Sequence, residues 1–372
     1  MADISTTAID DVLSFNREIK REWEKNRLPY AAFIEMTPRC NYNCVHCYMQ
    51  DYHAVKEMSY EKLIEIIDLL YEKGILFLTL SGGEIFTRKD FIEIYLYAKK
   101  KGFFIELFTN GSLLTQSIID CLAEYPPLLV DVSIYGSNEE TYFKVTGKRG
   151  EFERVINNVK LLKEKKIRVS LKTPVIKELA EDIDEIRSLA EELGIPYATS
   201  YEISRAIDGD AKTQKHQLSH EEMLKKEFKE ALSRDEDSRF EEDDYETTDD
   251  MFICNVASGS FVIDYLGNIC PCMKFRHRGI PVNKDSFEDI WHSFREFKKM
   301  KLANNHKCVK CEARYYCDFC PAEREFVLAS MEKTDPVSCA YAFARYSFYK
   351  KKYTIDQAIG LFYKLSGEEA VR

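Results

Sequence analysis

Between residues 31 and 203, short runs rich in β-branched and aromatic residues alternate with longer amphipathic stretches. The expected strands are 31–36, 75–80, 103–109, 128–134, 168–173 and 197–203. The expected helices, at 59–73, 90–101, 116–124, 152–165 and 183–193, carry apolar residues at helical spacing. Consecutive β–α units imply parallel strands joined by right-handed crossovers. Six units are too few for an eight-stranded barrel. We therefore expect an α/β fold with a partial (β/α)6 barrel of the TIM type.

The twelve cysteines are distributed unevenly. Cys40, Cys44 and Cys47 lie near the N-terminus, Cys121 stands alone, and all the others follow residue 250. The segment Met1–Phe15 has no basic stretch leading into an apolar one, so we expect no secretory signal and a cytoplasmic location. In that compartment, grouped thiols are more often metal ligands than disulfides. Cys121 falls on the apolar face of an expected helix and is predicted to be a core residue.

Composition and periodicity suggest how the chain is divided. We expect an N-terminal helix in 1–30, the barrel in 31–235, an acidic linker in 236–251, a metal-organised cysteine-rich domain in 252–340 and a helical segment in 341–372. A helix is also expected at 219–232. The net charge of −10 argues against nucleic-acid binding. No apolar run reaches the ~18 residues of a membrane span, so no membrane partner is expected.

The first cysteine group follows the first expected strand as Cys40-x3-Cys44-x2-Cys47. Three thiolates from one loop can hold three corners of a cubane iron–sulfur cluster. No fourth cysteine is near, so one iron would stay open, as a reactive metal site requires. A ferredoxin-type cluster, or a zinc site completed by His46 or His53, is the alternative.

This motif, at the end of a first barrel strand, resembles that of the radical S-adenosylmethionine (SAM) superfamily. The resemblance implies that the open iron of a [4Fe-4S] cluster chelates the amino and carboxylate groups of SAM. One electron then cleaves the sulfonium and releases a 5′-deoxyadenosyl radical, which abstracts hydrogen from the substrate. His46 stands where the family usually has an aromatic residue lining the adenine pocket.

The second expected strand ends in Leu80-Ser81-Gly82-Gly83-Glu84. Paired glycines let a ligand approach the backbone closely, and Glu84 could accept hydrogen bonds from an ammonium group. The sequence resembles the family's GGE motif, which binds the amino group of SAM. By the same resemblance, three polar residues at later strand ends are candidates to hold the SAM ribose or carboxylate: Asn110, Ser133 and Lys172. Ordinary strand-end polarity explains these three equally well.

The second cysteine group resembles the SPASM domain, which carries two auxiliary iron–sulfur clusters. The matching residues are Cys254, Gly267, Cys272, Cys308, Cys311, Cys317, Cys320 and Cys339. The resemblance assigns the second auxiliary cluster to four of them: Cys308, Cys311, Cys317 and Cys339. Structural zinc is the alternative, because Cys-x2-Cys pairs are also typical of zinc ribbons.

The first auxiliary cluster would be bound by Cys254, Cys272 and Cys320, which leaves it one ligand short. Cys270 fills the place in one interpretation, because residues two apart on a strand share a face. In the other, the position stays open and accepts a substrate thiolate. Both clusters are expected to be [4Fe-4S].

Enzymes with both parts mature peptides and proteins or act on tetrapyrroles. Segments such as Phe108-Thr-Asn-Gly resemble the branch that modifies ribosomally made peptides, so we expect a precursor-peptide substrate. Met273 stands where the sulfatase-maturing branch has a catalytic Asp, which disfavours that activity. A tetrapyrrole or other small-molecule substrate is the enzymatic alternative, and a multi-cluster electron-transfer protein is the non-enzymatic one. No catalytic acid or base can be nominated without the substrate's position.

Two protein partners are expected. Only about thirty residues precede the first strand, and they read as one amphipathic helix, Ile9–Asn26, so leader-peptide recognition would require a separate protein. Reductive cleavage of SAM also implies an electron donor such as flavodoxin or ferredoxin.

Overall fold

The computed structural model describes residues 22–23, 25–49, 56–233, 248–283, 285–318 and 320–367. The chain forms two compact units. Unit 1 contains the chain up to His216 together with Asn255–Phe297, and unit 2 contains Gln217–Cys254 and Lys298–Arg372. Segment 255–297, expected in the cysteine-rich domain, thus belongs to unit 1. Most of the predicted N-terminal helix and of the acidic linker lies outside the described residues.

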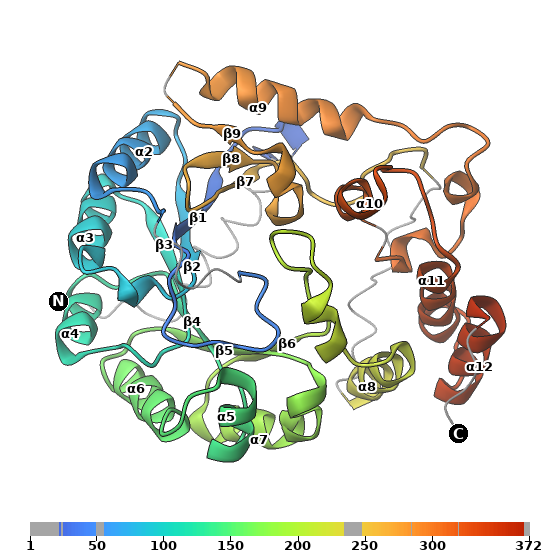
Figure 1. Cartoon of the computed structure of the whole chain (residues 1–372), viewed down its shortest axis with the longest axis horizontal. Coiled ribbons are helices and arrows are strands. Elements are labelled where there is room, and N and C mark those ends of the chain that lie inside the picture. The colour runs from blue at the N-terminus through green and yellow to red at the C-terminus, as the bar shows by residue number, and fades with distance from the viewer. Residues whose placement is uncertain are drawn as a thin grey trace. The chain divides into compact units, whose positions relative to one another are not determined.

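Unit 1 is built on a parallel sheet (Figure 1). Its predicted strands are all present: β1 (Ala31–Thr37), β2 (Phe77–Gly82), β3 (Phe104–Thr109), β4 (Leu129–Ser133), β5 (Val169–Pro174) and β6 (Tyr197–Ser200). They pair in chain order, each parallel to the next. This confirms the predicted partial barrel of the TIM type.

Three strands from the later part of the chain extend this sheet. β7 (Ser260–Ile263) pairs in parallel with β1, and the antiparallel strands β8 (Asn268–Cys270) and β9 (Ile280–Pro281) follow it. Within the described parts of the chain, the sheet therefore has nine strands, in the order β6-β5-β4-β3-β2-β1-β7-β8-β9. Their short sequences between cysteines did not show the period-two pattern of a strand.

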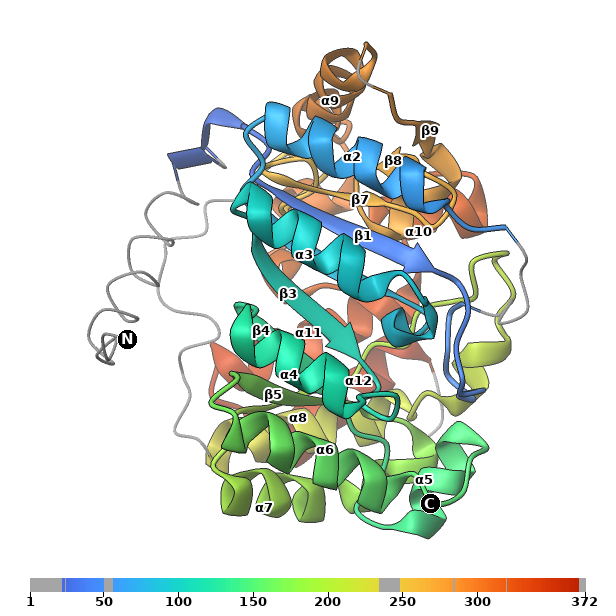
Figure 2. The same ribbon diagram turned by 90° about the vertical axis from the view of Figure 1, so that its left-hand side faces the viewer.

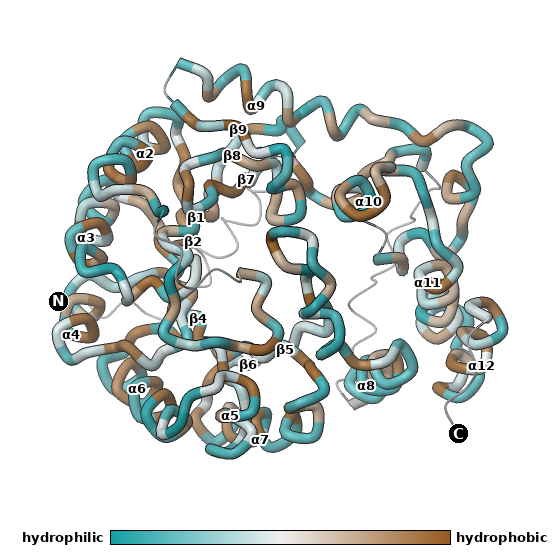
Figure 3. The backbone as a smooth tube through the Cα atoms, viewed as in Figure 1, coloured by the Kyte–Doolittle hydropathy of each residue, from teal (hydrophilic) through white to brown (hydrophobic). Residues whose placement is uncertain are grey.

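Helices cover the outer face of the sheet in a row, as Figure 2 shows. They are α2 (Tyr60–Glu72), α3 (Phe91–Lys101), α4 (Gln116–Glu124), α6 (Phe152–Glu164) and α7 (Ile183–Leu193), with α5 (Glu139–Thr146) after β4 and α9 (Phe287–Arg295) after β9. In Figure 3 the apolar sides of several of these helices face the strands. Leu70 of α2 and Leu78 of β2 are fully buried, and each contributes roughly 1.5–3 kcal/mol through burial.

The strands present two different faces. Along β2 to β5, fully buried apolar residues such as Leu107 and Val132 alternate with partly exposed residues such as Phe108 and Asp131. Because the side-chain period of a strand is two, the second set shares the face turned away from the helices. We call this face of β1–β5 the inward face.

Unit 2 is helical. It contains α8 (His220–Ser233), α10 (Pro321–Leu328), α11 (Pro336–Tyr349) and α12 (Ile355–Ser366). The helix expected at 219–232 is α8, and the C-terminal helical region is divided between α11 and α12. Phe228 of α8 stacks on Phe348 of α11 with ring centroids 4.0 Å apart. None of the described helices has the combination of length and apolar character that crossing a bilayer requires.

Candidate active site

The first three cysteines line one cavity in unit 1, with a volume of about 800 Å³. They follow β1, at the carboxyl edge of the parallel strands, where barrel enzymes place their active sites. Burial, together with the nearby Glu84, raises the pKa of Cys40 to about 12. Burial and the neighbouring thiols Cys47 and Cys40 also raise the pKa of Cys44 well above its usual value. Without a cation, these thiols would stay protonated.

Three adjoining thiols that share an open cavity fit a cluster held on three corners. Among the described residues, no group of three or more His, Cys, Asp or Glu is arranged to hold a single metal ion. His46, a possible zinc ligand, instead lies 5.6 Å from the ring of Tyr135, centroid to centroid. The other proposed zinc ligand, His53, lies outside the described residues. The described residues therefore do not supply a fourth zinc ligand beside the three cysteines.

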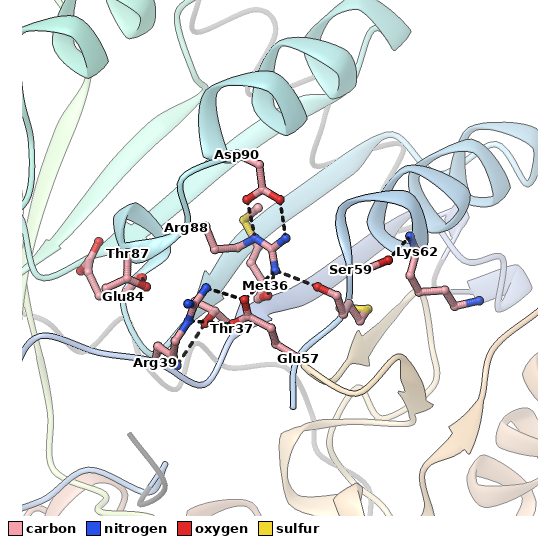
Figure 4. A network of polar contacts seen from close by, with 11 residues as sticks. Met36, Thr37, Arg39, Glu57, Ser59, Lys62, Glu84, Thr87, Arg88 and Asp90 are labelled. Atoms are coloured by element: carbon pink, nitrogen blue, oxygen red, sulfur yellow. Dashed lines mark hydrogen bonds and ion pairs between the residues drawn. The ribbon is translucent and has the colours of Figure 1, made fainter. Parts of the chain in front are cut away.

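The first three cysteines lie in residues 37–57, which we call the cysteine segment. A buried arginine, Arg88, holds the chain at both ends of this segment (Figure 4). The Arg88 guanidinium donates hydrogen bonds to the carbonyl oxygens of Met36 (3.1 Å), before the segment, and Met58 (2.9 Å), after it. Its other nitrogens bind the carboxylate of Asp90 at 2.9 and 2.7 Å. Glu57, 3.4 Å from Arg88, also pairs with Arg39. Arg88 was not singled out from the sequence, because a lone arginine after a glycine-rich turn carries no distinctive signal.

The paired glycines after β2 lie against the chain just before Cys40. The Gly83 N–H donates to the Thr37 carbonyl (2.7 Å) and the Glu84 N–H to the Arg39 carbonyl (2.8 Å). A Cβ at Gly83 would lie 2.2 Å from the Arg39 oxygen, and one at Gly82 2.3 Å from the Thr37 oxygen. The sequence predicted that the glycines allow a ligand to come close to the backbone. In the structure, the backbone of the cysteine segment itself lies against them.

Glu84 is fully buried beneath this contact. Its carboxylate accepts hydrogen bonds from the Phe86 N–H (3.2 Å), the Thr109 hydroxyl (2.8 Å) and the Asn110 N–H (2.7 Å). Burial raises its pKa to about 7, although these three donors oppose the shift. Two carboxylate oxygens offer about four acceptor positions, so one remains for a further donor such as an ammonium group.

The end of β3 also reaches the cysteine segment. The Asn110 amide donates to the Asn41 side chain (2.9 Å) and lies 3.9 Å from the Cys40 sulfur. Asn41 in turn donates to the Ser112 hydroxyl (2.8 Å). Asn41 and Ser112 were not predicted, although their positions beside Cys40 and Asn110 offered a weak signal.

Ser133 and Lys172 are register partners on β4 and β5. The Lys172 ammonium donates to Asp131 (2.7 Å) and lies 3.1 Å from the ring centroid of Phe108. Burial lowers the pKa of Lys172, and Asp131 opposes that shift. Lys172 is therefore a paired cation on the inward face rather than an unpartnered one.

A second cluster of polar side chains connects β1 with the segment after β8. Tyr48, the residue after Cys47, donates its hydroxyl proton to Glu35 of β1 (3.0 Å). Arg276 pairs with the same carboxylate. Glu35 is fully buried, so its pairing with Arg276 offsets the cost of burying its charge. Sequence reasoning missed all three residues, since their proximity depends on how segment 255–297 joins the sheet.

Unit 2 has its own group of cysteines. Four of them line one small cavity of about 30 Å³ together with Ile253, Arg314 and Phe343; they are Cys308, Cys311, Cys317 and Cys339. Arg314 is buried, and its guanidinium donates to the Cys308 carbonyl oxygen (3.1 Å). These are the four residues that the resemblance assigned to the second auxiliary cluster, and all four line this one cavity.

The cysteines expected at the first auxiliary cluster belong to different units. Cys270 and Cys272 lie in unit 1, and Cys254 and Cys320 in unit 2. Cys270 is fully buried on β8, where burial and the nearby Asp264 raise its pKa to about 12. The ligand set of this cluster remains a prediction. Cys121 is only partly buried on α4, whereas its neighbours Ile119 and Leu122 form the core contact.

Two family models match the chain. Residues 34–190 match the radical SAM superfamily, and residues 254–312 match SPASM, an iron–sulfur cluster-binding domain. The protein belongs to the radical SAM superfamily. It is an enzyme that uses SAM and a [4Fe-4S] cluster, and its SPASM domain binds additional iron–sulfur clusters.

This radical SAM enzyme is similar to a heme synthase and to a bacteriocin biosynthesis protein. The AdoMet-dependent heme synthase of Methanosarcina barkeri is 27% identical, over 84% of this chain and 97% of that protein. The subtilosin biosynthesis protein AlbA of Bacillus subtilis is 26% identical, over 79% of this chain and 67% of AlbA. The structure of Streptococcus suis SuiB bound to precursor peptide SuiA shares the fold, with a TM-score of 0.68 and 16% identity, over 91% of this chain and 82% of SuiB.

Only some of the predicted SAM-binding residues lie next to one another in the structure. Glu84 and Asn110 adjoin each other below the cysteine segment, and Ser133 and Lys172 lie on neighbouring strands. The described lining of the cysteine cavity includes none of these four. Their contacts with SAM, and those of His46, Gly82 and Gly83, remain predictions.

Proposed function

We propose that this radical SAM enzyme modifies a ribosomally made precursor peptide by hydrogen abstraction, installing a crosslink or a related oxidative change. When bound, SAM and its cluster supply the 5′-deoxyadenosyl radical. Cys40, Cys44 and Cys47 would hold that cluster. The backbone of Gly83 and Glu84 fixes the segment that carries them.

The charged residues on the inward face are the observation that favours a peptide substrate. The charged residues described on this face of β1–β5 are Glu35, Glu106, Asp131 and Lys172. Two of these carboxylates are already paired with cations, Asp131 with Lys172 and Glu35 with Arg276. Tetrapyrroles of haem synthesis carry several carboxylates, and both cations described at this face, Lys172 and Arg276, are already paired with carboxylates of the protein. A peptide instead offers neutral N–H donors, which suit carboxylate acceptors.

Two relatives support the same choice. AlbA takes part in bacteriocin biosynthesis, and SuiB has been solved with a precursor peptide. The heme synthase supports the alternative of a tetrapyrrole substrate, since it aligns over almost its whole length. Met273, in place of the expected Asp, disfavours sulfatase maturation.

The test compares the two substrate classes on anaerobically reconstituted protein with SAM. Short peptides encoded beside the gene are supplied in one arm and iron-coproporphyrin III in the other, each with deuterium at exchange-inert carbons. We expect deuterium in 5′-deoxyadenosine and a loss of hydrogen mass only with a peptide. Deuterium transfer from the porphyrin alone would replace this proposal with the tetrapyrrole reaction.

Leader recognition is proposed to need a separate protein. The isolated enzyme should then bind a full-length precursor peptide weakly and bind it more tightly when the protein encoded with it is added. Tight binding by the enzyme alone would contradict this part of the proposal.

A further inference from the structure

The cavity that contains the three cysteines has a basic wall. Lys148, Lys212, Lys215 and His216 line it, and its described lining contains no carboxylate. Lys148 follows α5, and the other three lie on the 3-10 helix η3 (Lys212–His216). The three lysines are exposed. This is notable in a chain whose net charge is −10, because chance alone would place acids here more often than bases.

No ion pair with a described residue neutralises the lysine charges of this wall. Within the described parts of the chain, none of the three ammonium groups forms an ion pair. Two carboxylates near these lysines have other partners. Asp210 accepts the backbone N–H of Lys212 (2.8 Å), and Glu178 pairs with His216. Lys177 adds another cation, since its ammonium donates to the Lys215 carbonyl oxygen (3.0 Å).

The basic wall lies on the active edge of unit 1. In Figure 2 the cysteine segment (blue), α5 and the loop after β6 (yellow-green) all lie at the side toward which the strand arrows point. The lysines therefore come from two separate loops that flank the cysteines at one edge. Exposed like charges on such a rim steer an oppositely charged partner during its diffusional approach.

We propose that Lys148, Lys212 and Lys215 form a docking surface for a small acidic electron-transfer protein that reduces the cluster held by Cys40, Cys44 and Cys47. In this step one electron leaves the reduced partner, such as a flavodoxin hydroquinone, and enters the cluster. No bond is formed or broken and no proton is transferred. The proposal rests on the cysteine assignment but not on the identity of the substrate.

Other ligands fit this wall less well. SAM carries a sulfonium cation, so uncommitted lysines do not favour it. A small anion would need buried donors that converge on it, whereas these ammonium groups are exposed and spread over two loops. A transient protein complex uses exposed charge of this kind to associate quickly and dissociate again.

The test uses the triple variant K148E/K212E/K215E in the reconstituted full chain. A matched control, K100E/K160E/R168E, makes the same change in net charge at exposed cations elsewhere in unit 1. Lys100 lies in the last turn of α3 and Arg168 directly precedes β5, so both belong to the opposite, amino-terminal side of the strands. Iron and sulfide content is measured first for each protein.

The rate of cluster reduction by flavodoxin hydroquinone is then followed by stopped-flow absorbance. At low salt, we expect the wild-type protein and the control to react at least about tenfold faster than the triple variant. Added salt should slow the wild-type reaction and leave the variant nearly unaffected, because salt screens the attraction. Reduced methyl viologen, a small cation, should react faster with the variant than with the wild type.

Several results would overturn the proposal. These are an unchanged flavodoxin rate in the triple variant, an equal loss in the matched control, or slower reduction by both flavodoxin and methyl viologen. The last would mean that the lysines serve the cluster itself. If the triple variant fails to retain iron, the single variants K148E and K215E, on different loops, must each slow the flavodoxin reaction and not the viologen reaction.

Discussion

At the scale of single residues, the two glycines of the Gly82-Gly83-Glu84 motif pack against the backbone that precedes Cys40. Gly82 and Gly83 leave room for the carbonyl oxygens of Thr37 and Arg39, and Gly82 has a φ of +137° that L-residues rarely adopt. Glu84 then connects this turn to the end of β3. The motif thus fixes the loop that carries Cys40, whatever it also does for SAM.

Replacing Gly83 with alanine should displace the cysteine segment. The new Cβ would lie 2.2 Å from the Arg39 carbonyl oxygen, a backbone atom that cannot swing away. We expect G83A to bind less iron on reconstitution, by about one [4Fe-4S] cluster. G360A is the matched control, because nothing lies within 4 Å of a Cβ there. It should retain full iron, and equal iron in both variants would contradict the prediction.

Glu84 should also make stability depend on pH. Its pKa is raised to about 7 in the folded protein from 4.5, so the folded state binds this proton more tightly than the unfolded state. The resulting stabilisation is fully present below pH 4.5 and is lost as the pH rises through about 7.

The variant E84Q should flatten this part of the pH profile. Between about pH 5 and about pH 8, the wild type should lose on the order of 2 kcal/mol more of its unfolding free energy than E84Q does. Urea denaturation at the two pH values measures the difference. Parallel pH profiles for the two proteins would show that Glu84 does not titrate in this range.

At the scale of elements, the cysteine loop is closed by a residue from another part of the chain. Arg88, between β2 and α3, donates hydrogen bonds to the carbonyl oxygens of Met36, near the end of β1, and Met58, just before α2 (Figure 4). Its side chain is only 3% exposed, whereas that of Arg39 in the same network is 46% exposed. The two arginines form a natural comparison between a buried and an exposed ion pair.

The variant R88M should be destabilised by roughly 3–5 kcal/mol, because it leaves buried carbonyl oxygens and carboxylates without their cation. It should also bind less iron, since both ends of the cysteine segment lose their anchor. R39M, which disturbs the same Glu57 from the exposed side, should cost less than about 1 kcal/mol. Chemical denaturation and iron content give both readouts, and similar losses in the two variants would refute the argument.

At the scale of the whole molecule, each compact unit contains its own cysteine-lined cavity. Cys40, Cys44 and Cys47 belong to unit 1, and Cys308, Cys311, Cys317 and Cys339 to unit 2. The chain leaves unit 1 at His216, returns to it at Asn255 and leaves it again after Phe297. A cluster in unit 2 can therefore be removed without altering any residue of the first cavity.

The double variant C308S/C339S should lose about four irons per chain. Formation of 5′-deoxyadenosine under dithionite should persist, while modification of a peptide substrate should fall. The variant C121S is the control and should keep all its iron, because Cys121 lies on α4 and lines neither of the two cysteine cavities. Complete loss of SAM cleavage in C308S/C339S would show that the two cavities are not independent.

The sequence by itself determined the six parallel strands, the helices between them and the two cysteine groups. Period-two and period-3.6 patterns are local properties of the chain, and cysteine spacing is visible without a fold. α5 was missed because its sequence, Glu139–Thr146, is short and weakly amphipathic. β7 to β9 were missed because only two to four residues form each of them.

Only the tertiary structure decided how the site is supported. Arg88 at the loop ends, Asp131 beside Lys172, Arg276 against Glu35 and the lysines around the cysteine cavity all depend on contacts between distant segments. Such contacts follow from strand order and register, which bring together residues that no local pattern relates. The chemistry of the site could thus be read from spacing, whereas its charges and anchors required the assembled sheet.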